Sequence, residues 1–379
     1  MLSPPWTADL AHSDSTRADQ VGKASPLNYS VEVLRGATAI RAAGPEIAEL
    51  LGRTDQDENP LLCLEFFLGR VRLFPGNEPV VLLARAAGRL EGAVYLYEKL
   101  FAGMRTGYLR GFDHLTGEST VIADERARVS LLQVAMQQLL LKTSARVVWA
   151  TVRQGKGEGD AVPIRQWGLI IRGEVSSLRR EHRLKLSDTF DATLARFGPH
   201  TRRNLRYYRR RAEKELEAQF NRELTFGESD QALRELSERS FQPFEESLAE
   251  WRKMDGLLRT RPGYFAMALR ARGKWISYLV GMRAGTTTYV LLQMNHSEYA
   301  RYSLSTVLRS YFFEHEIALG QEEIKFVNGT CAAFQRCCES DRCVTVSARR
   351  GLAAFVLFHW IAPWHSAPDH ALNMKRWTA

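Results

Sequence analysis

The chain has 379 residues, of which 45% are hydrophobic and 25% are charged, and its formal net charge is +9. This composition is that of an ordinary globular protein, so it excludes collagen-like, coiled-coil and wholly disordered chains. The length predicts two domains, and no apolar stretch has the roughly 20 residues that a membrane-spanning helix needs. Because the first residues lack the apolar core of a secretory signal, we expect a cytoplasmic protein with reduced cysteines.

Strand and helix patterns begin only after a polar leader. Residues 1–27 contain few large apolar side chains, and we expect them to be disordered. Residues 28–172 are the expected first domain. The elements expected in it are a hairpin that turns at Gly88, a strand, a polar loop, a helix and a strand, over residues 79–100, 106–110, 114–124, 126–142 and 146–152.

The same order of elements returns in 201–345, the expected second domain. Its elements are a hairpin that turns at Gly273, a strand, a polar loop, a helix ended by Gly320 and a strand, over residues 263–282, 286–294, 295–302, 303–319 and 323–327. The two hairpin glycines lie 185 residues apart, which indicates duplication of a whole domain rather than a short repeat. Residues 173–200 are the expected linker, and 346–379 are an expected helical tail.

This order predicts an α/β (α+β) protein of two similar domains, each with its own mixed, mostly antiparallel sheet flanked by helices. Neighbouring strands of each sheet are expected to splay near the middle.

The positive charge is concentrated in one segment. Between Arg172 and Lys214 there are thirteen basic and five acidic residues, and a basic helix is expected over 201–219. A localised basic block predicts an anionic partner: the phosphates of a cofactor, an anionic acceptor, a nucleic acid or a lipid surface. A solvated helix face is the alternative interpretation.

The order hairpin, strand, loop, helix, strand resembles the core of the GNAT acetyltransferase fold, and two tandem copies resemble its FemAB/CelD-like branch. The most specific support is Thr201–Arg211, whose sequence TRRNLRYYRRR resembles the basic helix that opens the second domain in that branch. The resemblance covers roughly residues 28–345. It implies an acyltransferase that moves an acyl group from acetyl-CoA or another acyl-CoA to an amine or hydroxyl of an acceptor.

Two stretches depart from the pattern of the resembled family. That family has a Gly in the loop before the phosphate-side helix, whereas Arg301–Thr306 (RYSLST) contains none. It also has an Asp-Phe-Gly-containing stretch that ends in Tyr-Lys. Here residues 325–329 are KFVNG, and the stretch ends in Phe334 and Gln335.

The junction between the second polar loop and its helix is the expected cofactor site. A helix N-terminus offers free backbone N–H groups and the positive end of a dipole, which suit the pyrophosphate of an acyl-CoA. Ser303 or Ser305 is expected to cap this helix, and Arg301 to add a charge-assisted hydrogen bond. The residues expected to bind the cofactor are Arg301, Ser303, Ser305, Thr306 and Asn328. An ordinary capped surface helix is the alternative.

Aminolysis of a thioester needs a base for the attacking amine and donors that stabilise the oxyanion. The resemblance implies that the backbone of a strand serves the oxyanion. The candidates for proton transfer near the expected cleft are His296, Glu298 and Tyr302, each of which is otherwise a polar loop residue.

The basic helix is expected to carry the acceptor site. Its apolar residues recur at helical spacing, which leaves the arginines on other faces; this stripe consists of Leu205, Tyr208, Ala212 and Leu216. An aromatic ring among arginines suits a stacked base. The residues expected to bind the acceptor are Arg202, Arg203, Arg206 and Tyr207.

Two other functions fit these residues: a tRNA-dependent aminoacyltransferase of the Fem type, or a catalytically degenerate tandem GNAT-like protein that binds an anionic partner. Nucleic acid is the less favoured partner, and contact of the basic helix or the aromatic tail with the inner face of a membrane is a further interpretation. The spacing C-x5-C-C-x4-C from Cys331 to Cys343 matches no zinc motif, so no metal is expected. No oligomeric state is predicted.

Overall fold

The computed structural model describes residues 29–351, except for 55, 57–58, 75, 113–119, 154–170, 240–244 and 328–329. The expected leader and most of the expected tail, residues 352–379, therefore lie outside the described residues. Within the described ranges, no helix is both long enough and apolar enough to cross a membrane.

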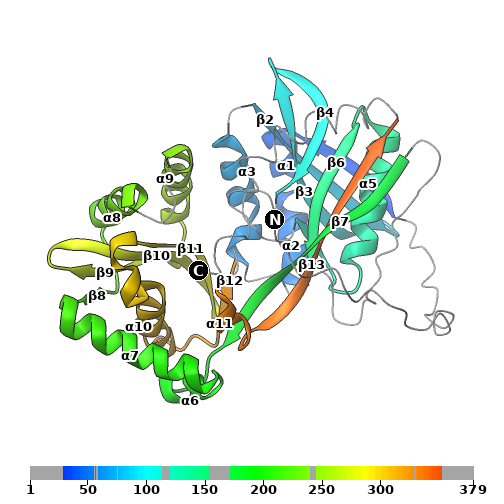
Figure 1. Cartoon of the computed structure of the whole chain (residues 1–379). Coiled ribbons are helices and arrows are strands. Elements are labelled where there is room, and N and C mark those ends of the chain that lie inside the picture. The colour runs from blue at the N-terminus through cyan, green and yellow to red at the C-terminus, as the bar shows by residue number, and fades with distance from the viewer. Residues whose placement is uncertain are drawn as a thin grey trace, which may run out of the picture.

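The described chain forms two halves joined by two long strands (Figure 1). The N-terminal half (residues 29–153) contains β1 (Ser30–Arg35), α1 (Ala37–Ala42), α2 (Gly44–Gly52), the 3₁₀ helix η1 (Pro60–Leu62), α3 (Leu64–Arg72), β2 (Asn77–Ala86), β3 (Arg89–Phe101), β4 (Met104–Gly111), β5 (Val121–Ala123), α5 (Arg128–Lys142) and β6 (Val147–Arg153). The C-terminal half (residues 186–338) contains α6 (Phe190–Ala195), α7 (Pro199–Leu216), β8 (Gln219–Asn221), α8 (Phe226–Arg239), α9 (Glu245–Arg259), β9 (Tyr264–Ala271), β10 (Lys274–Ala284), β11 (Thr287–Asn295), η2 (Ser297–Tyr302), α10 (Leu304–Ala318), β12 (Glu323–Phe326) and α11 (Ala332–Gln335). The long strands are β7 (Ile171–Lys185) and β13 (Glu339–Arg350).

The central hairpin of each half turns in the same way. Ala87 and Gly88 both have positive φ, 49° and 81°, as do Arg272 and Gly273, with 50° and 80°. Two consecutive positive φ values are typical of a type I′ turn, whose twist matches that of the flanking strands. The hairpins expected at the two glycines are therefore confirmed.

The strand pairings of the two halves are also equivalent. β2, β3 and β4 pair antiparallel, and β4 then pairs parallel with β6. β9, β10 and β11 pair antiparallel, and β11 then pairs parallel with β12. Each half thus has the mixed, mostly antiparallel arrangement that the sequence predicts, and the repeated order supports a duplication.

The expectation of two separate sheets is wrong, because β7 and β13 connect the halves into one 13-stranded sheet. β7 follows β6 in the chain but lies beside β12, and β13 follows β12 but lies beside β6. The two long strands also pair with each other, with Cys343 opposite Arg179. Without them, β6 and β12 would be edge strands with unpaired backbone groups. Each half is therefore completed by a strand from outside its own sequence range.

This exchange changes two of the expected boundaries. Residues 173–200 are not a linker, because they contain most of β7 and all of α6. Residues 346–350 do not begin a helical tail but belong to β13. The physical reason is visible in the burial of β13, where Val344, Val346 and Ala348 alternate with polar residues and all contact the core of the N-terminal half.

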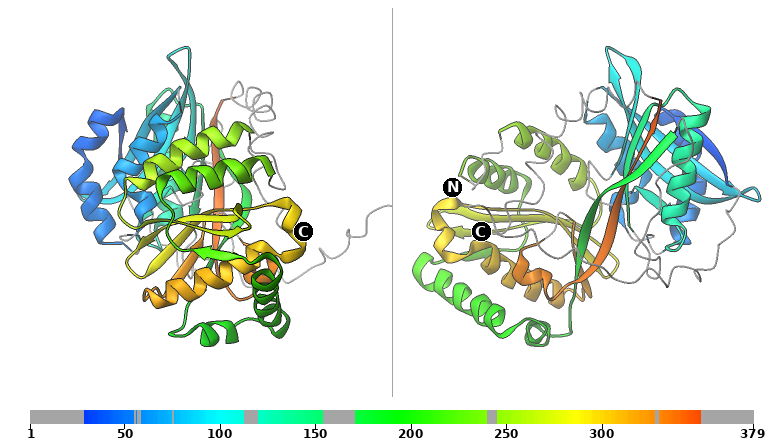
Figure 2. Two further views of the ribbon diagram at one scale, coloured as in Figure 1. Left: turned by 90° about the vertical axis from the view of Figure 1, so that its left-hand side faces the viewer. Right: turned by 45° about the vertical axis from the view of Figure 1, so that its right-hand side comes forward.

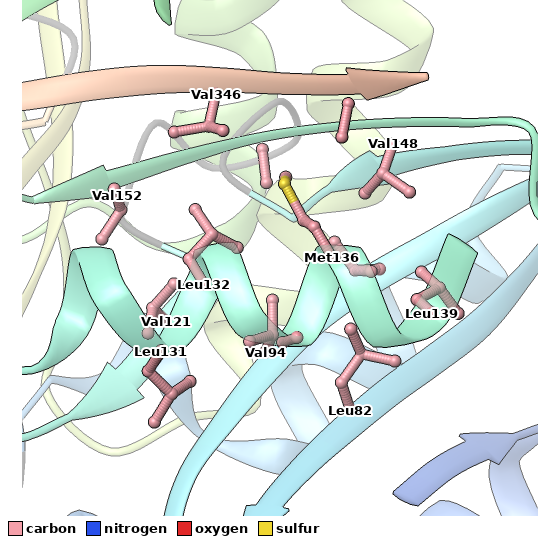
Figure 3. Close-up of a cluster of buried hydrophobic side chains, with 14 of the residues drawn as sticks. Leu82, Val94, Val121, Leu131, Leu132, Met136, Leu139, Val148, Val152 and Val346 are labelled. Atoms are coloured by element: carbon pink, nitrogen blue, oxygen red, sulfur yellow. The ribbon is translucent and has the colours of Figure 1, made fainter. Parts of the chain in front are cut away.

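Helices cover both faces of the sheet in each half. In the N-terminal half, α5 covers one face and α1 to α3 the other. Figure 3 shows α5 side chains such as Met136 packed with Val148 of β6 and Val346 of β13. In the C-terminal half, α7 and α10 lie on one face, and α8 and α9 on the other (Figure 2). The cluster around α3 also includes Tyr289 and Leu291 of β11, so the halves pack directly against each other.

Candidate functional site

The parallel pair of the C-terminal half opens part of the way along its length. β11 and β12 pair from Thr287 opposite Glu323 to Val290 opposite Phe326, and β12 then ends. β11 continues to Asn295, and no described strand pairs with this part on the β12 side. We call this opening the β11–β12 angle. The splaying expected from sequence is thus present in this half.

A β-bulge in β11 lies at the start of the angle. The register between β10 and β11 shifts where Val280 pairs with Leu292 but Gly281 pairs with Val290. A Cβ at Gly281 would lie 2.2 Å from the carbonyl oxygen of Tyr289, so only glycine fits this close approach. Bulges redirect a strand and terminate pairing, which explains why β11 departs from β12 here.

Helix α10 begins at the open end of the angle. The N–H groups of Leu304 and Ser305 have no hydrogen bond to any described residue, as the first turn of a helix leaves them. Ser303 adopts a left-handed conformation, with φ 48°, and neither serine side chain caps the helix. The expected cap is therefore wrong. What the junction presents instead is two backbone donors at the positive end of a helix dipole, an arrangement that suits an anion.

The other expected cofactor residues lie on two sides of this junction. The N–H of Thr306 donates to the Ser303 carbonyl, 2.8 Å away, within the first turn. Arg301 is exposed, and its Nη2 donates to the hydroxyl of Tyr302 at 2.9 Å. The carbonyl of Arg301 accepts from Nη1 of Arg211 on α7, at 3.4 Å. Asn328 lies outside the described residues.

Two of the three expected catalytic residues, His296 and Tyr302, are buried. Burial lowers the pKa of His296, which is 2% exposed. Its Nδ1 accepts the N–H of Glu298 at 3.3 Å, and its Nε2 has no hydrogen-bond partner in the described chain. Tyr302 is buried against α7, where its hydroxyl lies beside Arg301 and Glu215. Glu298 is exposed. A neutral imidazole with a free nitrogen can accept a proton, which makes His296 the candidate base that the structure describes in most detail.

The basic helix α7 has the expected apolar stripe, but some of its arginines form ion pairs with carboxylates of the same chain. Leu205, Ala212 and Leu216 are buried, and the helix begins at Pro199 and ends at Leu216, not at residue 219. Three of its arginines pair with carboxylates: Arg206 with Asp191 at 2.7 Å, Arg209 with Glu314 at 2.8 Å and Arg211 with Glu215 at 3.0 Å.

Of the other arginines of α7, Arg203 and Arg210 are exposed and Arg202 is half-buried. Arg202, Arg203 and Arg210 make no ion pair with a described carboxylate. Tyr207 is 50% exposed and lies edge-on to Tyr208, with 5.2 Å between ring centroids. Of the expected acceptor residues, Arg202, Arg203 and Tyr207 are therefore open to a partner, whereas Arg206 already has one.

Sequence analysis missed the charged side chain within the β11–β12 angle. Arg309 is on the second turn of α10 and is 3% exposed. Its Nε donates to Oε1 of Gln293 at 2.8 Å, and its Nη1 donates to the hydroxyl of Thr330 at 2.7 Å. The signal was available, because Phe312 and Phe313 lie three and four residues further along and place Arg309 on the buried side of the helix.

Comparisons with known proteins agree with this geometry. Residues 199–336 match the family model described as the acetyltransferase (GNAT) domain. This match covers most of the C-terminal half. No curated protein matches the sequence.

Solved structures resemble most of the chain at low sequence identity. FemX is 9% identical, with a TM-score of 0.53 over 84% of this chain and 98% of FemX. A tandem GNAT protein from the clavulanic acid biosynthesis pathway is 15% identical, with a TM-score of 0.49 over 85% of this chain and 99% of that protein. L-PGS from Bacillus licheniformis is 12% identical, with a TM-score of 0.46 over 82% of this chain and 98% of that protein. The likeness to FemX shows a shared fold that spans both halves.

Proposed function

We propose that this protein is a GNAT-type acyltransferase that moves an acyl group from acetyl-CoA or another acyl-CoA to an amine or hydroxyl of an acceptor. The observation that supports this most is the β11–β12 angle, which opens beside the N-terminus of α10 in the half that matches the GNAT domain. Ligands of α/β folds bind outside the carboxyl ends of parallel strands. The N–H groups of Leu304 and Ser305 would hold the pyrophosphate, and Arg301 would add a charge from the exposed side.

The chemistry follows from what a thioester requires. The acceptor nitrogen or oxygen attacks the thioester carbon, the carbonyl oxygen becomes an oxyanion, and the sulfur then leaves as the thiol of coenzyme A. The resemblance to GNAT enzymes assigns the oxyanion to the backbone of the strand that corresponds to β11. His296 at the end of β11 is suited to remove the proton of the acceptor, because burial keeps its imidazole neutral.

A negative charge at the start of α10 tests the cofactor site. Ser305→Asp should stabilise the helix by about 0.3–1 kcal/mol through its dipole, but it should weaken acetyl-CoA binding at least about tenfold by repelling the phosphates. Arg301→Ala should also weaken binding by roughly tenfold, because it removes one charge-assisted hydrogen bond. Calorimetric titration with acetyl-CoA and a longer acyl-CoA measures both effects.

Ser130→Asp is the matched control, because Ser130 lies in the first turn of α5, the equivalent helix of the N-terminal half. It should leave acetyl-CoA binding unchanged. Failure of the unmodified protein to bind any acyl-CoA, or normal binding by Ser305→Asp, would contradict the proposal.

The exposed charge of α7 favours a second candidate function, a tRNA-dependent aminoacyltransferase of the Fem type. Arg202, Arg203 and Arg210 have no acidic partner in the described chain, and Tyr207 lies beside them on the same helix. Aminoacyl transfer that is abolished by RNase would support this function. Acyl-CoA-dependent turnover that is insensitive to RNase would support the first, and binding without turnover would indicate a degenerate binding protein.

A further inference from the structure

Arg309 is a buried cation without a described counter-charge. Its partners are the neutral side chains of Gln293 and Thr330, together with the Cys331 sulfur, 3.8 Å from Nη1. No described carboxylate lies within ion-pair distance of it. Burial lowers the pKa of its guanidinium, yet arginine keeps its proton in proteins. A buried charge is strongly unfavourable unless it is paired, so the fold retains Arg309 at a cost.

The guanidinium group lies inside the β11–β12 angle. Gln293 is on β11 beyond the last residue that pairs with β12, and Thr330 follows β12 in the chain. The group is also held against two rings, 5.2 Å from the centroid of Phe326 and 5.0 Å from that of Phe334. Its Nη2, which has two N–H donors, makes no hydrogen bond to a described residue. One end of the guanidinium group is therefore fixed and the other end has donors to offer.

We propose that Arg309 binds a carboxylate of the substrate that enters this angle. A guanidinium group is planar and has parallel donors that match the two oxygens of a carboxylate. One carboxylate also neutralises one guanidinium charge. A phosphate carries about two negative charges near pH 7, which would leave one charge unpaired, since Arg309 is the one cation held at this point by the described residues. A carboxylate is thus the better match to a site of one buried cation.

The carboxylate has two sources within the proposed acyl transfer, on which this part of the inference rests. It belongs either to the acyl group of the donor, as in a dicarboxylic acyl-CoA, or to the acceptor, as in an amino acid. In both cases the reacting groups would meet where β11 and β12 part, with the carboxylate fixed on Arg309 and the pyrophosphate at the start of α10.

Small anions test the site without any assumption about coenzyme A. At constant ionic strength, acetate should raise the melting temperature of the protein more than chloride or neutral acetamide does, because ligands of the folded state stabilise it. Inorganic phosphate can also stabilise the protein at the start of α10, so only the part of its effect that is lost in Arg309→Gln reports on this site. Arg309→Gln keeps hydrogen-bonding groups but removes the charge, and it should weaken acetate binding at least about tenfold. Arg126→Gln removes the same charge from an exposed position just before α5, in the N-terminal half, and should leave the acetate effect unchanged.

Arg309→Lys provides a second test if Arg309→Gln does not fold. It retains the charge but loses the planar donors, so its acetate effect should be smaller than that of the unmodified protein. An acetate effect no larger than that of chloride in the unmodified protein would overturn the proposal. An effect of full size in Arg309→Lys would overturn it as well, and a phosphate effect that depends on Arg309 and exceeds that of acetate would overturn the carboxylate assignment.

Coenzyme A derivatives and small acceptors then distinguish the two sources. Tighter binding of succinyl-CoA than of acetyl-CoA, with the preference lost in Arg309→Gln, would assign the carboxylate to the donor. Binding of glycine but not glycinamide to the acetyl-CoA-loaded protein, again dependent on Arg309, would assign it to the acceptor. If acetyl-CoA binds but neither succinyl-CoA nor glycine is preferred, the carboxylate site is overturned, while the proposed acyl transfer is not contradicted. An Arg309-dependent acetate effect without any acyl-CoA binding would support the site and contradict the acyl transfer.

Discussion

The two halves of the molecule share their strand order and differ where their parallel strands end. In the N-terminal half, Tyr95 of β3 accepts a hydrogen bond from Phe112 and donates one to Thr120, so β4 and β5 form one interrupted strand along β3. Thr120 then donates to the carbonyl of Thr151 on β6 through both its N–H, at 3.2 Å, and its hydroxyl, at 3.1 Å. Among the described residues of the C-terminal half no such segment follows β11, and β11 and β12 part after Val290.

This difference shows how the same strand order can form either a continuous sheet or a sheet with an opening for a ligand. Where Thr120 and β5 bond to β3 and β6, the sheet continues between these strands as a support. Where the gap stays open, a helix N-terminus and a buried cation remain available to a ligand. Substitutions in the N-terminal half should therefore change stability alone, whereas substitutions in the C-terminal half should change ligand binding as well.

The largest expected effect tests whether the halves unfold as one unit. Each half contains a fully buried glutamate: Glu98 pairs with Arg35 and accepts the Gly107 N–H at 2.8 Å, and Glu316 pairs with Arg283 at 2.8 Å. Replacing either glutamate by Gln breaks a buried ion pair and should cost about 3 kcal/mol of unfolding free energy. Because one sheet spans both halves, urea unfolding of each variant should show a single transition. Two transitions, with only one shifted in each variant, would show that the halves are independent.

A smaller effect is expected from the basic surface of α7 in the C-terminal half. If Arg202, Arg203 and Arg210 contact a polyanion such as tRNA, each neutralises a phosphate and releases counterions. Raising salt from about 50 to 200 mM should then weaken binding roughly 20- to 40-fold for three contacts. Titrations with tRNA, anionic vesicles and acyl-CoA at both salt concentrations measure this.

Single replacements of these arginines by Ala should each reduce the salt slope by about one contact. Arg209→Ala is the matched control, because this arginine already pairs with Glu314. A flat salt response with every ligand would leave the charge of α7 as a solvated surface.

Loss of one hydrogen bond between Thr120 and β6 in the N-terminal half should have a modest effect on stability. Thr120→Val removes one hydroxyl hydrogen bond to the Thr151 carbonyl but keeps the side-chain shape and the backbone bond, so it should cost about 1 kcal/mol. Denaturant unfolding measures the loss. Acetyl-CoA affinity should be the same as in the unmodified protein, and a changed affinity would show that the N-terminal half also takes part in binding.

The smallest expected effect is a pH dependence that comes from the C-terminal half. Burial lowers the pKa of His296 below its unfolded value of about 6.5, so near that pH the unfolded chain binds more protons. Stability should therefore fall as the pH falls through about 6.5 towards the lower folded pKa, and be unaffected by this group at higher pH. His296→Gln should lose part of this decline in urea unfolding at about pH 8 and 5.5. His200→Gln, at an exposed position of α7, should retain it in full.

The sequence was sufficient for elements that depend on neighbouring residues. The glycine turns at Gly88 and Gly273, the apolar stripe of α7 and the stop of α10 before Gly320 are all local features, and each is present where it was expected. The repeated order of elements likewise indicated the GNAT-type arrangement. The position of the expected cofactor junction, between β11 and α10, followed from the same order.

What only the tertiary structure decided involves residues far apart in the chain. Whether β7 and β13 complete their own half or the other one depends on which edge strand needs backbone partners, and no local pattern records that. The same holds for the parallel strands of each half: in the N-terminal half Thr120 and β5 fill the space beside β6, whereas in the C-terminal half the β11–β12 angle stays open. Arg309 is the clearest case: its surroundings come from β11, the segment after β12 and α11, so its burial without a carboxylate arises only when these segments meet. Local propensity fixes elements, whereas strand partners and the cost of a buried charge are properties of the assembled fold.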